Sequence, residues 1–266
     1  MKQRPSFPVK LDTASEKMGV KKSETLNWIK GDRAGISNKP PVLTATGLGL
    51  DSSVVRKNMV KRLADAGVED HMVLNALETI ERHKFLDTAL ANQAYEDTSL
   101  PIGFGQTISK PNVVARMLEL LRQGKNLRIT GKLGRVLEIG TGCGYQAALL
   151  SQIATEVYSI ERVKGLHERA RENLRSMRIA NLHLLFGDGM IGYPSGAPYA
   201  GIIAAAGGDN IPQLWIEQLD EGGRIVAPMS VIKGTQSLVV IDKTKGEIHK
   251  SVLEQVNFVP LKAGID

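Results

Sequence analysis

Cysteine is nearly absent from the sequence, since Cys143 is the only one among its 266 residues. A single thiol excludes an internal disulfide and a cysteine-rich zinc site, and it fits a reducing compartment. Cys143 lies in a glycine-rich loop, where it could serve as a nucleophile, but we interpret it as a small side chain that the loop tolerates. The five histidines are scattered along the chain, and we assign none of them to a metal.

Long apolar runs are also missing. No run approaches the roughly 20 residues that a membrane-spanning helix needs, and the first residues lack the apolar core of a secretory signal. The sequence therefore predicts a cytoplasmic protein that does not enter a membrane. Its 42% hydrophobic content supports a substantial core, and its length allows one large domain or two small ones.

Net charge is small over most of the chain. Residues 1–50 contain nine lysines and arginines against four acids, which accounts for five of the six net positive charges. The remainder is nearly neutral, so we do not expect the globular part to bind nucleic acid. Residues 1–50 also lack lasting periodicity, and we interpret them as a flexible basic extension. It is either an electrostatic tether to nucleic acid or an acidic protein, or a solvated tail, which we favour.

The most informative stretch is 135–145, Arg-Val-Leu-Glu-Ile-Gly-Thr-Gly-Cys-Gly-Tyr. Its first part is a short apolar run typical of a buried parallel strand. Gly140, Gly142 and Gly144 follow at every second position, and an apolar helix begins near Tyr145. Glycines at this place allow a sharp turn and let a ligand lie against N–H groups at the start of the helix.

The spacing of this loop points away from dinucleotides, which favour G-x-G-x-x-G. Here the spacing is G-x-G-x-G, and the acid Glu138 precedes it, which suits a ligand carrying positive charge. Glu161 ends the next expected strand, 155–160, where a carboxylate can accept hydrogen bonds from both ribose hydroxyls. A nucleoside with a cationic end and no phosphate describes S-adenosylmethionine. The alternative is a structural turn that binds nothing.

The second half of the chain alternates between strands and helices, which predicts an α/β fold with a mostly parallel, doubly wound sheet. Ligands bind such sheets at the carboxyl ends of the strands. Asp188 lies at one of these ends and could accept a hydrogen bond from an adenine amino group, or it could be a turn aspartate. The expected strands are 135–139, 155–160, 182–186, 200–206, 223–228, 238–241 and 252–260.

Residues 51–92 show the periodicity of three helices, which we expect to pack on the sheet. Asp51 or Ser52 is expected to cap the first of them. Residues 94–111 have the composition of a loop, and a helix follows with Pro111 in its first turn. Ser109 lies at or beside the N-cap, so its hydroxyl either caps this helix or is presented, with free N–H groups, to an anion such as a carboxylate. We therefore divide the chain into the extension 1–50 and a domain 51–266, with a helical cap and substrate loop at 51–111 and a cofactor-binding core at 112–266.

At this point the residues resemble a known family. The segment 100–109, Leu-Pro-Ile-Gly-Phe-Gly-Gln-Thr-Ile-Ser, is similar to the signature of bacterial protein-L-isoaspartate O-methyltransferases, and 136–146 resembles the nucleoside loop of that family. The segments 161–165, 187–189, 218–223 and 258–261 are similar as well. The resemblance covers residue 53 to the end of the sequence and implies the seven-stranded sheet of S-adenosylmethionine-dependent methyltransferases.

The resemblance also implies an activity, namely transfer of a methyl group from S-adenosylmethionine to the carboxylate of L-isoaspartyl residues in damaged proteins and peptides. The ester then closes to a succinimide, whose hydrolysis partly restores aspartate. We expect a monomer that needs no metal. The active-site serine of the family carries over to Ser109. The cofactor contacts carry over to Thr107, Ile108, Glu138, Gly140, Gly142, Gly144, Glu161, Asp188 and, by its place in the late region, Gln236.

Two departures from the family pattern are visible. Ala200 stands where an aspartate is usual, and Ala204–Gly208 reads Ala-Ala-Ala-Gly-Gly instead of Val-Thr-Ala-Ala followed by proline. The second change predicts a more flexible loop beside the substrate. It also leaves open an S-adenosylmethionine-binding protein of the same fold with another substrate or little turnover. An amine methyltransferase is disfavoured, because the polar Asp/Asn-Pro-Pro-aromatic run that grips an amine is missing.

Overall fold

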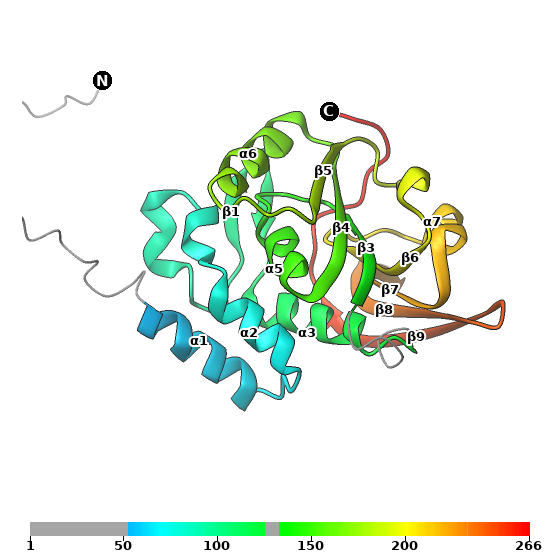
Figure 1. The fold of residues 1–266 in the computed structure, drawn as a ribbon, viewed down its shortest axis with the longest axis horizontal. Helices are drawn as coiled ribbons and strands as arrows, with labels where there is room; N and C mark the ends of the chain where they lie inside the picture. Colours follow the sequence, from blue (N-terminus) through cyan, green and yellow to red (C-terminus); the bar gives the residue numbers. More distant parts are fainter. Residues whose placement is uncertain (1–52, 126–132, 233) are drawn as a thin grey trace, which may run out of the picture. The chain divides into compact units, whose positions relative to one another are not determined.

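The computed structural model describes residues 53–125, 133–232 and 234–266, with the side chain of residue 232 left aside (Figure 1). The extension expected over residues 1–50 lies outside the described residues. Asp51 and Ser52, expected to cap the first helix, lie outside them as well. Within the described part of the chain, no helix is both long enough and apolar enough to cross a membrane.

The centre of the fold is a seven-stranded sheet with the order β5-β4-β3-β6-β7-β8-β9 (Figure 1). The first five strands in this order are parallel, and β8 and β9 are antiparallel to their neighbours. The predicted doubly wound, mostly parallel seven-stranded sheet is thus confirmed. The strands are β3 (Leu133–Ile139), β4 (Ala154–Glu161), β5 (Leu182–Phe186), β6 (Tyr199–Ala204), β7 (Leu219–Ile232), β8 (Thr235–Thr244) and β9 (Glu247–Val256).

Helices cover both faces of the sheet, and most residues of its inner strands are buried. In β3, Val136 packs into the same core as the helical cap, whereas Leu137 and Ile139 pack with Trp215 of α7 on the opposite face. The cap consists of α1 (Ser53–Asp65), α2 (His71–Thr79), and the short 3₁₀ helices η1 (Arg82–Phe85) and η2 (Thr88–Gln93). The other helices are α3 (Pro111–Arg122), α5 (Tyr145–Ile153), α6 (Lys164–Arg175), η3 (Pro194–Gly196) and α7 (Gln213–Gln218).

Two segments differ from the sequence predictions near the site. Residues 94–111 were expected to be a loop, but they contain a hairpin of β1 (Leu100–Gly103) and β2 (Gln106–Ile108), paired from Leu100 to Ile108. A third cap helix was expected, and η1 and η2 stand in its place. Both segments are short and rich in turn residues, so their hydrophobic periodicity is too brief to reveal strands or 3₁₀ turns.

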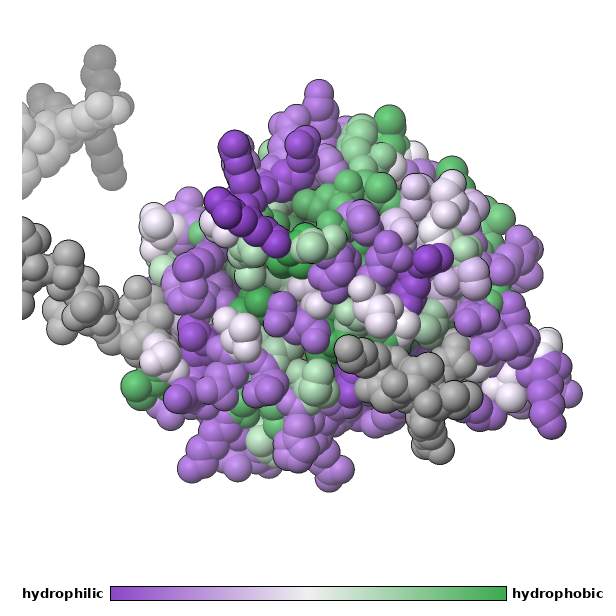
Figure 2. Space-filling model, in the orientation of Figure 1, coloured by the Kyte–Doolittle hydropathy of each residue, from purple (hydrophilic) through white to green (hydrophobic). Residues whose placement is uncertain are grey.

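The antiparallel end of the sheet also differs from prediction. The strands β7 and β8 extend well beyond 223–228 and 238–241, and the last strand spans 247–256 instead of 252–260. Most side chains of the edge strand β9 are exposed, and polar residues at such positions hide a strand from a search for apolar runs. At the other edge, β5 contributes exposed apolar surface beside hydrophilic side chains (Figure 2).

Candidate active site

A cavity of about 420 Å³ opens where the carboxyl ends of β3 and β4 meet the β1–β2 hairpin. Doubly wound sheets bind ligands at the place where the strand order reverses, which here lies between β3 and β6. The cavity wall combines the hairpin, the loop after β3, the start of α6, the loop after β6 and the chain after β9.

Three glycines with left-handed backbone shape the loop after β3. Gly140, Gly142 and Gly144 have φ values of 90°, 57° and 90°, which residues with a Cβ rarely adopt. Gly140 and Gly142 line the cavity, and a Cβ on Gly142 would approach Ile102 to 3.2 Å. Gly144 instead faces α6, because a Cβ there would lie 2.8 Å from Leu174 Cδ1. Two of the predicted glycines therefore border the cavity, and the third permits close helix packing.

Glu161 ends β4, is 4% exposed and lines the cavity. Its Oε2 accepts a hydrogen bond from Gly142 N at 2.8 Å, and its Oε1 accepts one from Val163 N at 2.9 Å. Each carboxylate oxygen can accept more than one hydrogen bond. Glu161 can therefore hold the glycine loop and still accept hydrogen bonds from the hydroxyls of a ligand.

Three other main-chain N–H groups of the loop also make hydrogen bonds within the protein. Ile160 O accepts hydrogen bonds from Gly140 N at 2.8 Å and from Thr141 N at 3.2 Å, and Thr141 O accepts one from Gly144 N at 2.9 Å. A phosphate-binding loop keeps such groups free for the anion. In this loop four N–H groups donate to carboxylate and carbonyl oxygens of the protein, so its chemistry differs from that of a dinucleotide site.

Glu138 lies behind the loop and outside the cavity wall. It is fully buried, and Ser159 donates a hydrogen bond to its Oε2. Its Oε1 has no hydrogen-bond partner among the described residues. Burial raises the pKa of Glu138 to about 8, and the hydrogen bond from Ser159 opposes this only in part. The predicted contact of Glu138 with the cofactor stays a prediction.

Asp188 and Gln236 bind protein main chain and do not line the cavity. Asp188 accepts hydrogen bonds from Met190 N at 2.8 Å and from Gly264 N at 2.7 Å. Gln236 accepts one from Phe258 N at 2.8 Å and donates one to Phe258 O at 3.3 Å. Both side chains hold the chain after β9 in place, so the structure brings them near the site without aiming them into it.

The hairpin residues Thr107, Ile108 and Ser109 all line the cavity. The N-cap of α3 is Lys110, whose side chain makes no capping hydrogen bond. Ser109 is therefore beside the cap and does not occupy it. Its hydroxyl makes no hydrogen bond in the part of the chain that the structure describes, so it is available to a ligand.

The chain after β9 forms a wall of the cavity that the sequence did not predict. Val259, Pro260, Leu261, Lys262 and Asp266 all line it. The segment is attached at both ends by main-chain hydrogen bonds. At its start, Gly207 N donates to Val259 O at 2.8 Å and Gly207 O accepts from Leu261 N at 2.7 Å. At its end, the main chain of Asp266 makes hydrogen bonds with that of Arg162 and Lys164. Main-chain hydrogen bonds of this kind do not depend on residue type, so they cannot be predicted from the sequence. Only the resemblance of residues 258–261 to the family indicated that this region matters.

A buried arginine beneath the hairpin was also missed. Arg82 is 0% exposed, its Nε donates to Ala94 O at 2.8 Å, and its Cζ lies 5.0 Å from the ring centroid of Tyr145. Burial lowers its pKa. It links the chain leading into the hairpin with the first residue of α5. The sequence around it, Arg-His-Lys-Phe, gives no signal that separates this buried arginine from its basic neighbours.

The loop after β6 is held more firmly than its sequence predicts. Ala205 and Ala206 line the cavity, and Ala205 N donates to Ile139 O at 2.8 Å. Gly208 N donates to Pro228 O at 3.2 Å, and Gly208 O accepts from Ser230 N at 2.8 Å. These main-chain bonds tie the loop to β3 and β7 without a proline.

Cys143 is the one thiol in the cavity wall. Burial raises the pKa of the Cys143 thiol, which makes it a poor nucleophile at neutral pH. Within residues 53–125, 133–232 and 234–266, no group of three or more His, Cys, Asp or Glu side chains is arranged to hold a metal ion.

Comparison with known proteins is consistent with this geometry. Residues 54–265 match the family model described as protein-L-isoaspartate(D-aspartate) O-methyltransferase. A protein-L-isoaspartate O-methyltransferase from Methylibium petroleiphilum is 52% identical over 264 residues, covering 98% of this chain and 97% of the relative. One from Leptothrix cholodnii is 56% identical over 228 residues, covering 85% and 79%.

Solved structures agree. A protein-L-isoaspartate O-methyltransferase superimposes with a TM-score of 0.70 at 28% identity, covering 79% of this chain and 67% of the other. A Plasmodium falciparum structure in complex with S-adenosyl-L-homocysteine has a TM-score of 0.66 at 26% identity, with coverage of 78% and 98%. The resemblance drawn from the sequence is therefore confirmed, and this chain belongs to the protein-L-isoaspartate(D-aspartate) O-methyltransferase family.

Proposed function

We propose that this enzyme transfers a methyl group from S-adenosylmethionine to the free carboxylate of L-isoaspartyl residues in damaged proteins and peptides. In such a residue the backbone runs through the side-chain carbonyl, so the α-carboxylate is the free one. The ester closes to a succinimide without further help from the enzyme, and hydrolysis partly restores aspartate. The observation that carries the proposal is family membership over residues 54–265.

The residues of the cavity fit S-adenosylmethionine. The N–H group of Gly142, at the centre of the loop, is bound by Glu161 and is not free for a phosphate. Glu161 retains acceptor capacity for two ribose hydroxyls, and a carboxylate at that place suits a ligand with net positive charge. Gly140 and Gly142 leave room for close approach of the ligand. We propose that these three residues, with Thr107 and Ile108, form the direct contacts. Glu138, Gly144, Asp188 and Gln236 then act by supporting them.

The chemistry requires no general base. A carboxylate has a pKa near 4 and is already ionised at neutral pH, and the bound cosubstrate supplies a methyl group on a cationic sulfur. The free hydroxyl of Ser109 can position this carboxylate with one neutral hydrogen bond. A lysine or arginine would bind it more strongly, but would also reduce the electron density that makes it a nucleophile.

The walls of the cavity contribute alignment and exclusion of water. The attack joins a negative carboxylate to a methyl group on a positive sulfur, so both charges are lost in the products. Water stabilises the separated charges of the reactants and therefore slows the reaction. The hairpin and the chain after β9 close the cavity from two sides. Holding the two reactants in line is a contribution that can reach about 7–11 kcal/mol.

One assay tests the proposal directly. The enzyme is incubated with labelled S-adenosylmethionine and two peptides of the same sequence, one with aspartate and one with isoaspartate. We expect base-labile label on the isoaspartyl peptide alone. Equal labelling of both peptides would contradict the proposal. Binding of S-adenosylmethionine with no labelled peptide would favour the alternative of a binding protein with another substrate.

We also propose that the enzyme works as a monomer in the cytoplasm. The one thiol, Cys143, is free and buried, as suits a reducing compartment. Sedimentation at micromolar concentration tests the first statement, with a dimer as the contradicting result. Cell fractionation tests the second, and recovery of the enzyme outside the cytoplasmic fraction would contradict it.

A further inference from the structure

A second cavity, of about 460 Å³, borders the first at Ser109, the residue that both walls share. It lies between the start of α3 and the end of β9. Its polar wall includes Ser99, Lys110, Asn112, Arg116 and Glu254. No part of the proposed methyl transfer uses this cavity.

We propose that the second cavity receives a residue adjacent to the isoaspartyl residue and selects it by charge, through Lys110, Arg116 and Glu254. This inference rests on the proposed function, in which Ser109 holds the acceptor carboxylate. Neighbouring residues in an extended peptide are spaced by about 3.3–3.6 Å. A peptide anchored at Ser109 therefore brings a flanking side chain into a cavity that begins at the same residue.

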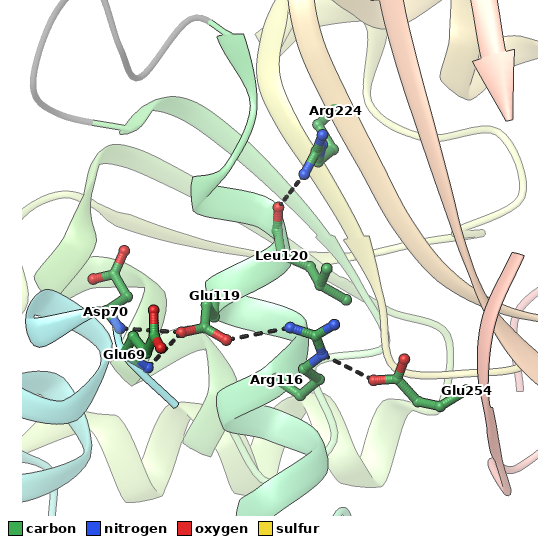
Figure 3. A network of polar contacts seen from close by, with 7 residues as sticks. All are labelled: Glu69, Asp70, Arg116, Glu119, Leu120, Arg224 and Glu254. Carbon is green, nitrogen blue, oxygen red and sulfur yellow. Dashed lines mark hydrogen bonds and ion pairs between the residues drawn. The ribbon is translucent and has the colours of Figure 1, made fainter. Parts of the chain in front are cut away.

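The charges in this wall are not balanced. Arg116 lies between two carboxylates (Figure 3), with its Nε 2.9 Å from Glu254 Oε1 and its Nη1 3.3 Å from Glu119 Oε2. Glu119 is only 7% exposed in its side chain and also accepts hydrogen bonds from Glu69 N and Asp70 N at 2.7 and 3.0 Å. It is committed to the protein interior, whereas Glu254 is 45% exposed in its side chain.

Glu254 is therefore the one carboxylate in a wall that also carries Lys110 and Arg116. Lys110 Nζ is 3.9 Å from Asp97 Oδ2, and both side chains are nearly half exposed, so this ion pair is weak. The positive excess predicts that a flanking glutamate is accepted better than a flanking lysine. At about 6 Å and partial solvent screening, one unit charge changes such a preference by about three- to tenfold.

The test uses isoaspartyl peptides that differ only in one residue next to the isoaspartate, which is glutamate, glutamine or lysine. One series varies the preceding residue and a second varies the following one. The ratio of kcat/KM for glutamate over lysine is measured for the natural enzyme, for Glu254→Gln and for Lys110→Gln. The control is Glu247→Gln, which removes an exposed charge at the far end of β9.

In one of the two series we expect a ratio above one, raised about three- to tenfold by Glu254→Gln and lowered by a similar factor by Lys110→Gln. The control should stay within about twofold of the natural enzyme. Melting temperatures show whether each variant is folded. Ratios that remain unchanged in both variants and both series, while methylation continues, would overturn the inference. Failure to methylate any isoaspartyl peptide would instead overturn the proposed function and this inference with it.

Discussion

At the scale of single residues, Glu161 has two tasks, because it holds the glycine loop and faces the cavity. Glu161→Gln keeps the size of the side chain but removes its charge and half of its acceptors. A hydrogen bond to a charged group contributes about 1.5–3 kcal/mol. We therefore expect the Kd for S-adenosylmethionine, measured by calorimetry, to rise about ten- to hundredfold. Glu168→Gln, at an exposed position of α6, is the control and should leave the Kd unchanged. An unaltered Kd in Glu161→Gln would remove this residue from the cofactor contacts.

Glu138 makes stability depend on pH. Its pKa is about 8 in the folded protein and about 4.3 in an unfolded chain, so the folded state binds more protons between these values. The free energy of unfolding should therefore fall as pH rises from about 4.3 to 8, by up to about 1.4 kcal/mol per unit. In Glu138→Gln the side-chain amide oxygen can still accept the hydrogen bond from Ser159, but the side chain does not titrate.

Urea denaturation at pH 5.5, 7 and 8.5 measures this effect. Relative to the natural protein, Glu138→Gln should gain stability steadily from the lowest pH to the highest. If the two proteins differ by the same amount at all three pH values, the carboxyl of Glu138 does not titrate in this range.

The sequence predicts which residues lie near the site better than it predicts which groups their side chains contact. Glu161, Gly140 and Gly142 could be predicted because they follow apolar strands, whose ends must meet at one edge of a parallel sheet. Asp188 and Gln236 are predicted to contact the ligand, and in the structure their side chains bind main chain of the segment after β9. No local pattern reveals that a distant segment returns to satisfy these two side chains.

At the scale of elements, the tip of the β1–β2 hairpin rests on the start of α6. Phe104 has a φ of 53°, and a Cβ on Gly165 would lie 2.2 Å from its ring. Arg169 Nη1 also donates to Ile102 O at 2.6 Å. Gly165→Ala must therefore displace the hairpin tip or the exposed ring of Phe104.

We expect Gly165→Ala to weaken binding of S-adenosylmethionine, because the displaced tip forms a wall of its cavity. In a Phe104→Gly background the ring is gone, so adding Gly165→Ala should have little further effect on the Kd. Calorimetry on the four proteins of this cycle tests the contact. Equal effects of Gly165→Ala in both backgrounds would show that Phe104 does not press on Gly165.

Buried strands could be predicted from the sequence better than exposed or short ones. Most residues of the inner strands β3, β4 and β6 are buried, and each sequence contains apolar residues at most of its buried positions. The exposed residues of β9 and the two short strands of the hairpin gave no apolar run. The sequence therefore predicted the cofactor edge of the sheet well and the substrate side poorly.

At the scale of the described molecule, a polar network fastens the helical cap to α3 and the sheet (Figure 3). Glu119 accepts the N–H groups of Glu69 and Asp70 between α1 and α2, and Asp70 Oδ2 lies 2.8 Å from Arg122 Nε. Arg224 of β7 donates to Leu120 O at 2.9 Å. We propose from these links that the cap and the core unfold together.

Glu119→Ala tests this proposal, because it leaves two main-chain N–H groups and Arg116 without their shared acceptor. Unsatisfied buried groups cost about 1–3 kcal/mol each, so we expect the free energy of unfolding to fall by about 2–4 kcal/mol, in a single urea transition. Glu172→Ala, at an exposed position of α6, is the matched control. Two separate transitions in the variant would show that the cap unfolds on its own.

The central claim, that a carboxylate held at Ser109 is methylated, is tested most directly by the kinetics of Ser109→Ala. Steady-state rates on an isoaspartyl peptide are compared with the calorimetric Kd for S-adenosylmethionine, with Ser176→Ala at an exposed position as the control. Loss of one hydrogen bond to a charged group is equivalent to about 1.5–3 kcal/mol. The account predicts that kcat/KM for the peptide falls about ten- to hundredfold while the Kd stays within about twofold. A variant with unchanged kcat/KM would contradict it.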